Sequence, residues 1–213
     1  AHIAAAIGWP RFVAKYGRTG LGQYLAEKPL AAVEGMIARG VNAPLASSCG
    51  RLFDAVAAAV GLCADRVQYE GQAAMQLQAA AERAGTAEDG AYPFAIARPA
   101  PGAALHLDPA PMWSALLDDI AAGTATERIA ARLHAGLADA IARLVATLAP
   151  PGRIALSGGS FQNRRLLEQV MERLAARGFD VLTHRAVPAN DGGLALGQAA
   201  VAAAHMLDAD EGE

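Results

Sequence analysis

Between Thr124 and Leu148, apolar residues recur at every third or fourth position, and this repeat constrains the fold more than any other feature. Its members are Ile129, Leu133, Leu137, Ile141, Leu144 and Leu148. This spacing places them on one face of a helix, which has to be buried against other elements. Thr124 and Glu127 have the spacing of a capping box, and Pro150-Pro151-Gly152 stops the helix. The sequence therefore predicts a long amphipathic helix in a helix-rich fold.

After this helix, short apolar runs alternate with helical patterns. Strands are predicted over 153–156 and 179–184, and helices over 161–177 and 194–207, the last as a closing helix. The order strand, helix, strand implies a parallel pair of strands. The end of the chain is thus expected to have an α/β arrangement.

The first half of the chain also favours helices. They are predicted over 29–39, 51–61, 71–84 and 108–123, with a loop-rich stretch over 85–108 that contains a strand at 93–97. Glycines and a proline break any long element before residue 23.

Charge and composition exclude several classes of partner. The net charge is −3, with 18 Lys and Arg against 21 Asp and Glu, and no basic stripe is present, so nucleic acid is not an expected ligand. No apolar run approaches ~18 residues and no signal peptide is visible, so we expect no membrane contact and a cytoplasmic location. Cys49 and Cys63 form no CxxC pair and are interpreted as small buried residues in a reducing compartment.

The histidines give no ligand pattern. His106, His134, His184 and His205 are scattered, and we interpret them as ordinary surface or half-buried residues.

The turn Ser157-Gly158-Gly159-Ser160 is the first candidate site. It lies between a predicted strand and a predicted helix, where paired glycines let backbone N–H groups approach an anion at the helix N-terminus. Asn163 would lie in the first turn of that helix, next to the same candidate anion site. A phosphate or nucleotide site is one interpretation; an ordinary tight turn, with Asn163 as a local cap, is the other.

The second candidate is the turn 188–193, which contains Asp191 and follows the second strand. Asp191 alone fits a simple helix N-cap. However, both glycine-containing turns follow adjacent parallel strands, and open α/β sheets bind ligands at that edge. A carboxylate beside a phosphate-binding turn is a natural ligand for a metal that bridges to the nucleotide.

A third candidate is the stretch 47–54, SSCGRLFD, which opens a predicted helix. Arg51 could hold a phosphate or carboxylate and Asp54 could bind ribose hydroxyls, although both residues also suit an ordinary exposed helix start. The turn Tyr69-Glu70-Gly71-Gln72 opens the next helix with the same alternatives.

Four ordered segments together resemble the C-terminal part of the catalytic domain of the HypF family of carbamoyltransferases. They cover 36–58, 69–74, 156–167 and 182–198, and the resemblance extends from about residue 29 to the end of the chain. It implies an actin-like, ribonuclease-H-like lobe, helix-rich with a small mixed sheet, related to the TsaD-type transferases.

The resemblance also implies roles for individual residues. Asp191 matches a metal-binding aspartate, and Asn163 with the Gly158-Gly159 turn matches a nucleotide-binding pattern. Asp54 and Gly71 match positions that line the nucleoside pocket.

The activity that the family implies is carbamoyl transfer. Such proteins use carbamoyl phosphate, ATP and a divalent metal (Mg, Zn or Fe) to make carbamoyl adenylate. They then pass the carbamoyl group to a cysteine of a HypE-like acceptor during hydrogenase maturation. No individual catalytic residue is assigned.

Departures from the family pattern concern the N-terminal segment, 1–28, which we interpret as a remnant of a first lobe, ahead of the C-terminal lobe over 29–213. His2 resembles the second histidine of an HxxxH metal motif, and no Asp-Gly-Thr-Gly phosphate turn is found. The chain is therefore expected to be a fragment of the full enzyme with little activity alone. Two alternatives stay open: another O-carbamoyltransferase of the same superfamily, or a non-catalytic lobe that acts as an interaction module and self-associates through its interlobe face.

Overall fold

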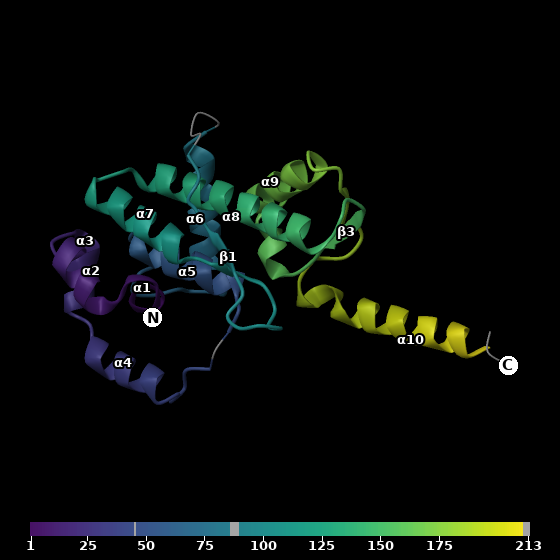
Figure 1. Ribbon diagram of the computed structural model, residues 1–213, viewed down its shortest axis with the longest axis horizontal. Coiled ribbons are helices and arrows are strands. Elements are labelled where there is room, and N and C mark those ends of the chain that lie inside the picture. Colours follow the sequence, from purple (N-terminus) through teal and green to yellow (C-terminus); the bar gives the residue numbers. More distant parts are fainter. Residues whose placement is uncertain (45, 86–89, 211–213) are drawn as a thin grey trace.

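The computed structural model describes residues 1–44, 46–85 and 90–210, and helices dominate it (Figure 1). The α-helices are α1 (His2–Ile7), α2 (Trp9–Tyr16), α3 (Gly20–Ala26), α4 (Leu30–Ala38), α5 (Cys49–Ala59), α6 (Gln72–Arg83), α7 (Ala110–Ala121), α8 (Thr126–Leu148), α9 (Arg164–Ala175) and α10 (Leu194–Asp210). Two short 3-10 helices, η1 (Gly159–Gln162) and η2 (Asp191–Gly193), precede α9 and α10. The helices predicted from apolar spacing are therefore confirmed, each within a few residues of its expected ends.

The strands form two small sheets within the described part of the chain. β1 (Ala95–Ala97) pairs antiparallel with β2 (His106–Asp108), and β3 (Arg153–Leu156) pairs parallel with β4 (Asp180–Thr183). The parallel pair was predicted, whereas β2 was not. The expectation of a single small mixed sheet is therefore wrong, because the antiparallel and parallel pairs do not join.

The core is built around α8, which packs between α6 and α9 and also contacts the β1–β2 pair. Ten of its residues are buried, including the predicted stripe members Ile129, Leu133 and Leu137. The last three members depart from the prediction, since Ile141 and Leu144 are only half-buried and Leu148 is 64% exposed at the end of the helix. The buried residues meet large side chains from α6, α7 and α9, such as Leu77, Trp113, Leu116 and Leu166. Burial of this apolar stripe is the main stabilising contribution in the fold.

The predicted capping box at the start of α8 is wrong. The helix begins at Thr126 after Ala125, which provides no side-chain cap. The Thr124 hydroxyl instead bonds the Asp119 carboxylate of α7 at 3.3 Å. That carboxylate also binds Arg132 of α8 at 2.7 Å, so the α7–α8 connection is held by tertiary contacts rather than by a local cap.

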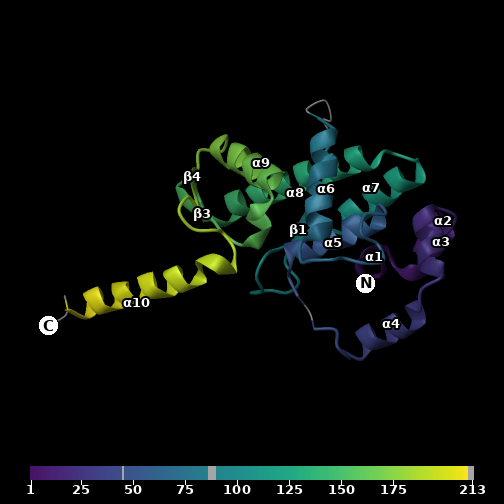
Figure 2. The same cartoon turned by 180° about the vertical axis from the view of Figure 1, so that it is seen from behind.

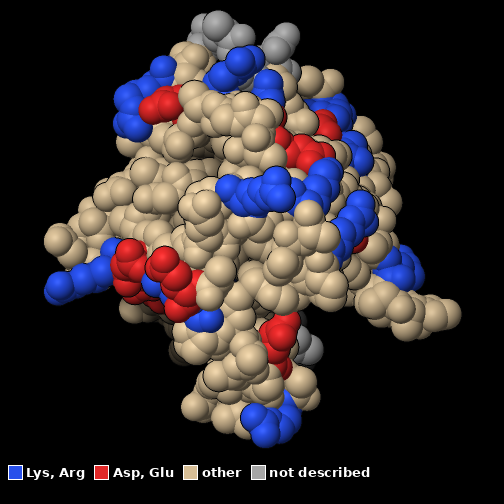
Figure 3. Space-filling view, turned by 90° about the vertical axis from the view of Figure 1, so that its left-hand side faces the viewer, with Lys and Arg blue, Asp and Glu red and all other residues tan. Residues whose placement is uncertain are grey.

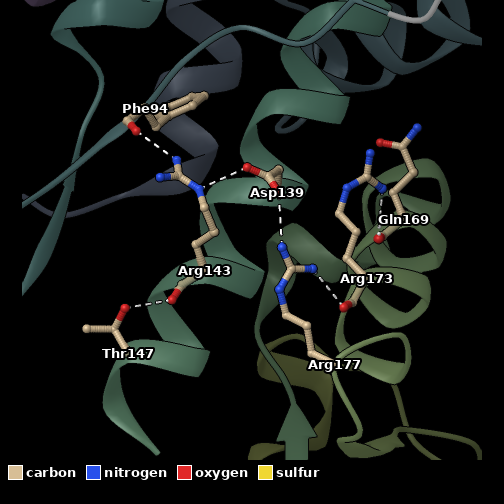
Figure 4. A network of polar contacts seen from close by, with 7 residues as sticks. All are labelled: Phe94, Asp139, Arg143, Thr147, Gln169, Arg173 and Arg177. Atoms are coloured by element: carbon tan, nitrogen blue, oxygen red, sulfur yellow. Dashed lines mark hydrogen bonds and ion pairs between the residues drawn. The ribbon is translucent and has the colours of Figure 1, made fainter.

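A polar network joins α8 to α9 and to the segment before β1 (Figure 4). The Asp139 carboxylate accepts hydrogen bonds from Arg143 at 2.9 Å and from Arg177 at 3.3 Å. Arg143 also donates to the Phe94 carbonyl oxygen at 2.8 Å. One carboxylate on α8 therefore orients two guanidinium groups that reach different neighbours.

Residues 1–28 form α1, α2 and α3, and α1 packs on α7. Phe12 and Tyr16 of α2 are buried together with Leu117 of α7 in a second, smaller hydrophobic cluster. The Tyr16 hydroxyl donates to Asp118 at 2.7 Å. This segment is thus packed on the rest of the chain, while its interpretation as a remnant of a first lobe remains a prediction.

Two helices contribute little to the core. None of the α10 side chains described over 194–207 is buried, and the helix projects from the body (Figure 2). The expectation that it closes the fold is wrong. α4 is also peripheral, with Val33 and Ile37 40% and 45% exposed.

Charges of both signs lie next to each other on the face in Figure 3. Among the described residues, no helix is long and apolar enough to cross a membrane.

Candidate functional site

The two glycine-containing turns lie side by side at the carboxyl ends of β3 and β4. The Gly158 N–H donates to the Ala189 carbonyl oxygen at 2.8 Å. A Cβ added to Gly159 would lie 3.8 Å from the Cβ of Asn190, and the His184 Nε2 lies 2.9 Å from the Ser157 hydroxyl. The predicted meeting of the two turns at one sheet edge is therefore confirmed, and it follows from the parallel pairing of the strands.

Gly158 has a backbone conformation that residues with a Cβ rarely adopt. Its φ of 106° is disfavoured for residues with a Cβ, so glycine is required where the chain turns from β3 into η1. The first N–H groups of η1 have no intrahelical partner, and an anion could accept from them.

Asn163 is the N-cap of α9. Its Oδ1 accepts from the Leu166 N–H at 3.0 Å, so the local-cap interpretation is confirmed. The structure adds a contact that the sequence did not predict, because the Asn163 Nδ2 lies 2.9 Å from the His134 Nε2. Asn163 itself is half-buried.

The interpretation of His134 as a surface or half-buried residue is wrong. It is 0% exposed, and its Nδ1 lies 2.7 Å from the Ala130 carbonyl oxygen. Burial lowers its pKa to about 4, so the ring is neutral near pH 7. A sequence signal for this existed: His134 follows Leu133 within the apolar stripe, one turn after Ala130, and therefore faces the core.

The start of α5 reaches the same turn. Ser48 caps the helix by accepting from the Arg51 N–H at 3.3 Å. Burial raises the pKa of the Cys49 thiol, and the nearby Ser160 opposes that rise. The Phe53 ring lies 5.1 Å from the His134 ring, centroid to centroid. Cys49 is half-buried, whereas burial was expected. One face of α5 packs on the glycine turn and on His134, which lies behind Asn163.

The sequence also singled out Asp54 and Gly71, of which Asp54 lies in the middle of α5 and Gly71 directly precedes α6. Asp54 is half-buried, and its carboxylate has no hydrogen-bond or ion-pair partner in the described part of the chain. Gly71 precedes α6 with a φ of 79°, a left-handed conformation that favours glycine. In the part of the chain that is described, no hydrogen bond or ion pair joins either residue to the glycine turns.

Asp191 is exposed at the start of η2. The neighbouring Asn190 is the cap there, since its side chain accepts from the Gly192 N–H at 3.1 Å. The alternative of Asp191 as a simple N-cap is therefore not supported. Within the described residues the Asp191 carboxylate has no partner, which leaves its oxygens available to a cation.

The two residues predicted as metal ligands do not come together. His2 lies in α1, where its ring stacks on Trp113 at 6.0 Å between centroids, and burial followed by the charge of the chain's amino terminus lowers its pKa. It lines an apolar cavity of about 180 Å³ with α3, α4 and α5. Figure 1 shows α1 and the start of α10 well apart. No group of three or more His, Cys, Asp or Glu suited to a metal occurs in the part of the chain that is described.

Comparison with known proteins identifies close relatives. The family described as "Carbamoyltransferase, Kae1-like Domain, second subdomain" matches residues 3–198. A carbamoyltransferase HypF of Rhodobacter capsulatus is 47% identical over 174 residues, which make up 80% of this chain and 21% of that protein. A carbamoyltransferase HypF homolog of Cupriavidus necator is 38% identical over 194 residues, 85% of this chain and 47% of that protein. The chain thus spans less than half the length of these relatives.

Solved structures agree. A crystal structure of full-length HypF in the phosphate- and nucleotide-bound form superimposes with a TM-score of 0.77 at 32% identity, covering 92% of this chain and 25% of that one. The structure of T. kodakarensis HypF gives a TM-score of 0.65 at 26% identity, covering 84% of this chain and 22% of that one. The resemblance seen in the sequence motifs is confirmed, and the chain belongs to the HypF family of carbamoyltransferases, where it corresponds to the second subdomain of the Kae1-like domain.

Proposed function

We propose that this chain supplies one half of the nucleotide site of a HypF-type carbamoyltransferase. The observation that carries the proposal is the hydrogen bond between Gly158 and Ala189, which holds two glycine-containing turns together. Asn163 lies at one of these turns and Asp191 at the other. A nucleotide bound to the HypF of known structure supports a nucleotide as the ligand.

Each part of this edge suits a phosphate group. Glycine at 158 and 159 keeps side chains away, so a phosphate can approach the N–H groups at the start of η1. Asn163 can add a side-chain donor from the N-cap of α9. Asp54 in the middle of α5 and Gly71 just before α6 are proposed to border the nucleoside, as their match to the family pattern implies.

A divalent metal fits this edge only in part. The unpartnered Asp191 carboxylate is a suitable hard ligand for a divalent metal, with Mg²⁺ as the first candidate and Zn or Fe as the alternatives. Because the described residues hold no cluster of three ligands, the remaining ligands have to come from nucleotide phosphates or from other parts of the protein. When bound, the metal would neutralise phosphate charge. A metal role for His2 rests on the resemblance alone.

The reaction of the whole protein is proposed from its family. Carbamoyl phosphate would lose phosphate to leave carbamate, which would displace pyrophosphate from ATP to give carbamoyl adenylate. The cysteine thiol of a HypE-like acceptor would then take the carbamoyl group and release AMP. The contribution of this chain is to hold the nucleotide phosphates and to shield the labile adenylate from water. We also propose that the lobe is actin-like, with ATP bound between it and a second lobe.

Calorimetric titration of Mg-ATP tests the half-site. Asn163→Ser keeps a helix cap but removes the carboxamide, and Asp191→Asn keeps the shape but removes the charge. Asp180→Asn is the control, since Asp180 lies at the opposite end of β4 in an exposed pair with Arg153. We expect the wild-type chain to bind Mg-ATP. Both site variants should weaken this binding by about tenfold or more, and the control should leave it unchanged. A folded wild-type chain that does not bind Mg-ATP contradicts the proposal.

Self-association is a second proposal, supported by the apolar side chains on the projecting α10. Leu194 and Val201, seven positions apart and therefore on one face of α10, are each more than half exposed. An apolar surface of this kind favours association with another protein surface. Sedimentation velocity at increasing concentration is expected to show a dimer, and a monomer at all concentrations would contradict it.

A further inference from the structure

One side chain stands out in the interior. His134 is the single polar or charged side chain that is buried among the described residues, and it lies directly behind Asn163. Burying an imidazole is unfavourable unless both ring nitrogens have partners. Both do: Ala130 on the same helix and Asn163 at the start of α9.

The direction of each hydrogen bond in this chain of contacts is fixed. The backbone N–H of Leu166 can only donate, so the Asn163 atom that it contacts is the oxygen. The Asn163 Nδ2 therefore faces His134 and donates to Nε2. The Ala130 carbonyl can only accept, so Nδ1 carries the ring proton. The neutral Nδ1–H tautomer satisfies every contact.

This arrangement determines what Asn163 can offer a ligand. Its oxygen is used by the helix cap, and one of its two Nδ2–H groups is used by His134. The second Nδ2–H remains, on a residue that is half-buried. Without His134, the carboxamide could rotate about its last side-chain bond and lose this orientation.

We propose that His134 is a positioning residue of the nucleotide site: it holds the Asn163 carboxamide so that the remaining N–H is presented to the bound nucleotide. This inference rests on the proposed function. His134 does not touch the ligand itself, since it is completely buried. The Phe53 ring from α5 packs on the imidazole, so α5 helps to fix its plane.

Two substitutions of His134 distinguish a positioning role from a role in packing alone. In His134→Gln, the amide oxygen can take the place of Nε2 and accept from Asn163. In His134→Asn, the shorter amide can take the place of Nδ1 and donate to Ala130, but nothing accepts from Asn163. Both variants lose the ring and its packing on Phe53, so a purely structural role predicts similar effects for both.

Mg-ATP affinity is measured by calorimetry in the wild-type chain, in both His134 variants, in Asn163→Ser and in the double variant His134→Asn/Asn163→Ser. We expect His134→Asn to weaken binding by about tenfold and His134→Gln by no more than about twofold. The double variant should bind as Asn163→Ser does, because His134 acts through Asn163. Equal affinities in wild type and His134→Asn, or additive losses in the double variant, would overturn the proposal.

A second measurement does not require nucleotide. The side-chain amide of Asn163 gives a pair of ¹⁵N–¹H resonances, and its order parameter reports how rigidly it is held. It should be rigid in wild type and in His134→Gln, and mobile in His134→Asn. An amide that is equally rigid in all three shows that His134 does not position it. If Asn163→Ser and Asp191→Asn both bind Mg-ATP like wild type, the proposed function fails, whatever the amide shows.

Discussion

Helices α8 and α10 are both rich in alanine, but only one of them is part of the core. α8 buries ten residues between α6 and α9. α10 projects from the body, and none of its side chains described over 194–207 is buried (Figure 1). Two helices of similar amino-acid composition thus differ completely in how far they are buried.

The difference lies in the spacing of the large apolar residues. In α8 they recur every three or four positions and form one stripe. In α10 the large apolar residues are Leu194, Leu196, Val201, Met206 and Leu207, and their steps of two, five, five and one spread them around the axis. Alanine makes both segments helical, but only a stripe lets a helix bury one face.

Truncating one leucine in each helix gives the largest expected contrast. Leu133→Ala in α8 should lower the free energy of unfolding by about 2 to 5 kcal/mol, because a 0% exposed side chain leaves a cavity. Leu196→Ala in α10 should change it by less than about 0.5 kcal/mol, since Leu196 is 57% exposed. Urea denaturation measures both. Comparable losses would show that α10 packs against the body.

Acidification tests the buried histidine of α8. With its pKa lowered to about 4, folded His134 binds fewer protons than the unfolded chain, so stability is lost as the pH falls from about 6.5 to 4. The loss is about 3 kcal/mol by linkage and should disappear in His134→Gln. Arg165 and Glu82 are the charges that act on the ring, with opposite effects.

The free energy of unfolding is measured with urea for wild type and His134→Gln at the same pH values. The contribution of the carboxylates, which both chains share, then cancels in the difference. His205→Gln on the exposed face of α10 controls for the removal of an imidazole. Parallel pH profiles for wild type and His134→Gln would contradict the assignment of a neutral buried ring.

One glycine-to-alanine substitution in each helix tests how closely the backbones of α8 and α10 are packed. A Cβ at Gly136 of α8 would overlap the backbone of Tyr92, so Gly136→Ala should cost about 1 to 3 kcal/mol. A Cβ at Gly197 of α10 meets nothing within 4 Å, so Gly197→Ala should raise helicity without any loss of stability. Thermal unfolding followed by circular dichroism distinguishes the two. A neutral Gly136→Ala would mean that the 90–94 segment is not packed on α8.

Removing α10 has the smallest effect expected on the core. A chain that ends at Gly193 should keep the urea midpoint of the full chain, with a change in unfolding free energy below about 0.5 kcal/mol. If α10 drives self-association, the same truncation should abolish the dimer in sedimentation velocity. A large drop in the midpoint would place α10 in the cooperative core.

Much of the architecture could be predicted because it depends on local pattern. Apolar spacing located α8 and α9, and alternating strand and helix signals located the parallel pair. The meeting of the Gly158 and Asp191 turns followed from that pairing, because parallel strands bring their carboxyl ends to one edge. Motif order led to the HypF family without any structural information.

Other features depended on partners far away in the chain. Thr124 has the spacing of a capping residue but bonds Asp119, and the loop-rich stretch contains β2, whose three residues acquire strand structure only by pairing with β1. The contact between His134 and Asn163 could not be predicted from local pattern, because the two residues are 29 positions apart.

The sequence by itself determined where helices form, where the chain turns and which residue types stand at the turns, since these depend on neighbours within a few positions. Only the tertiary structure decided which helix faces are covered, that Asn190 rather than Asp191 caps η2, and that a buried imidazole holds Asn163. These outcomes depend on burial and on hydrogen bonds between distant segments, and the free energy of both is set by surroundings that only the folded chain creates.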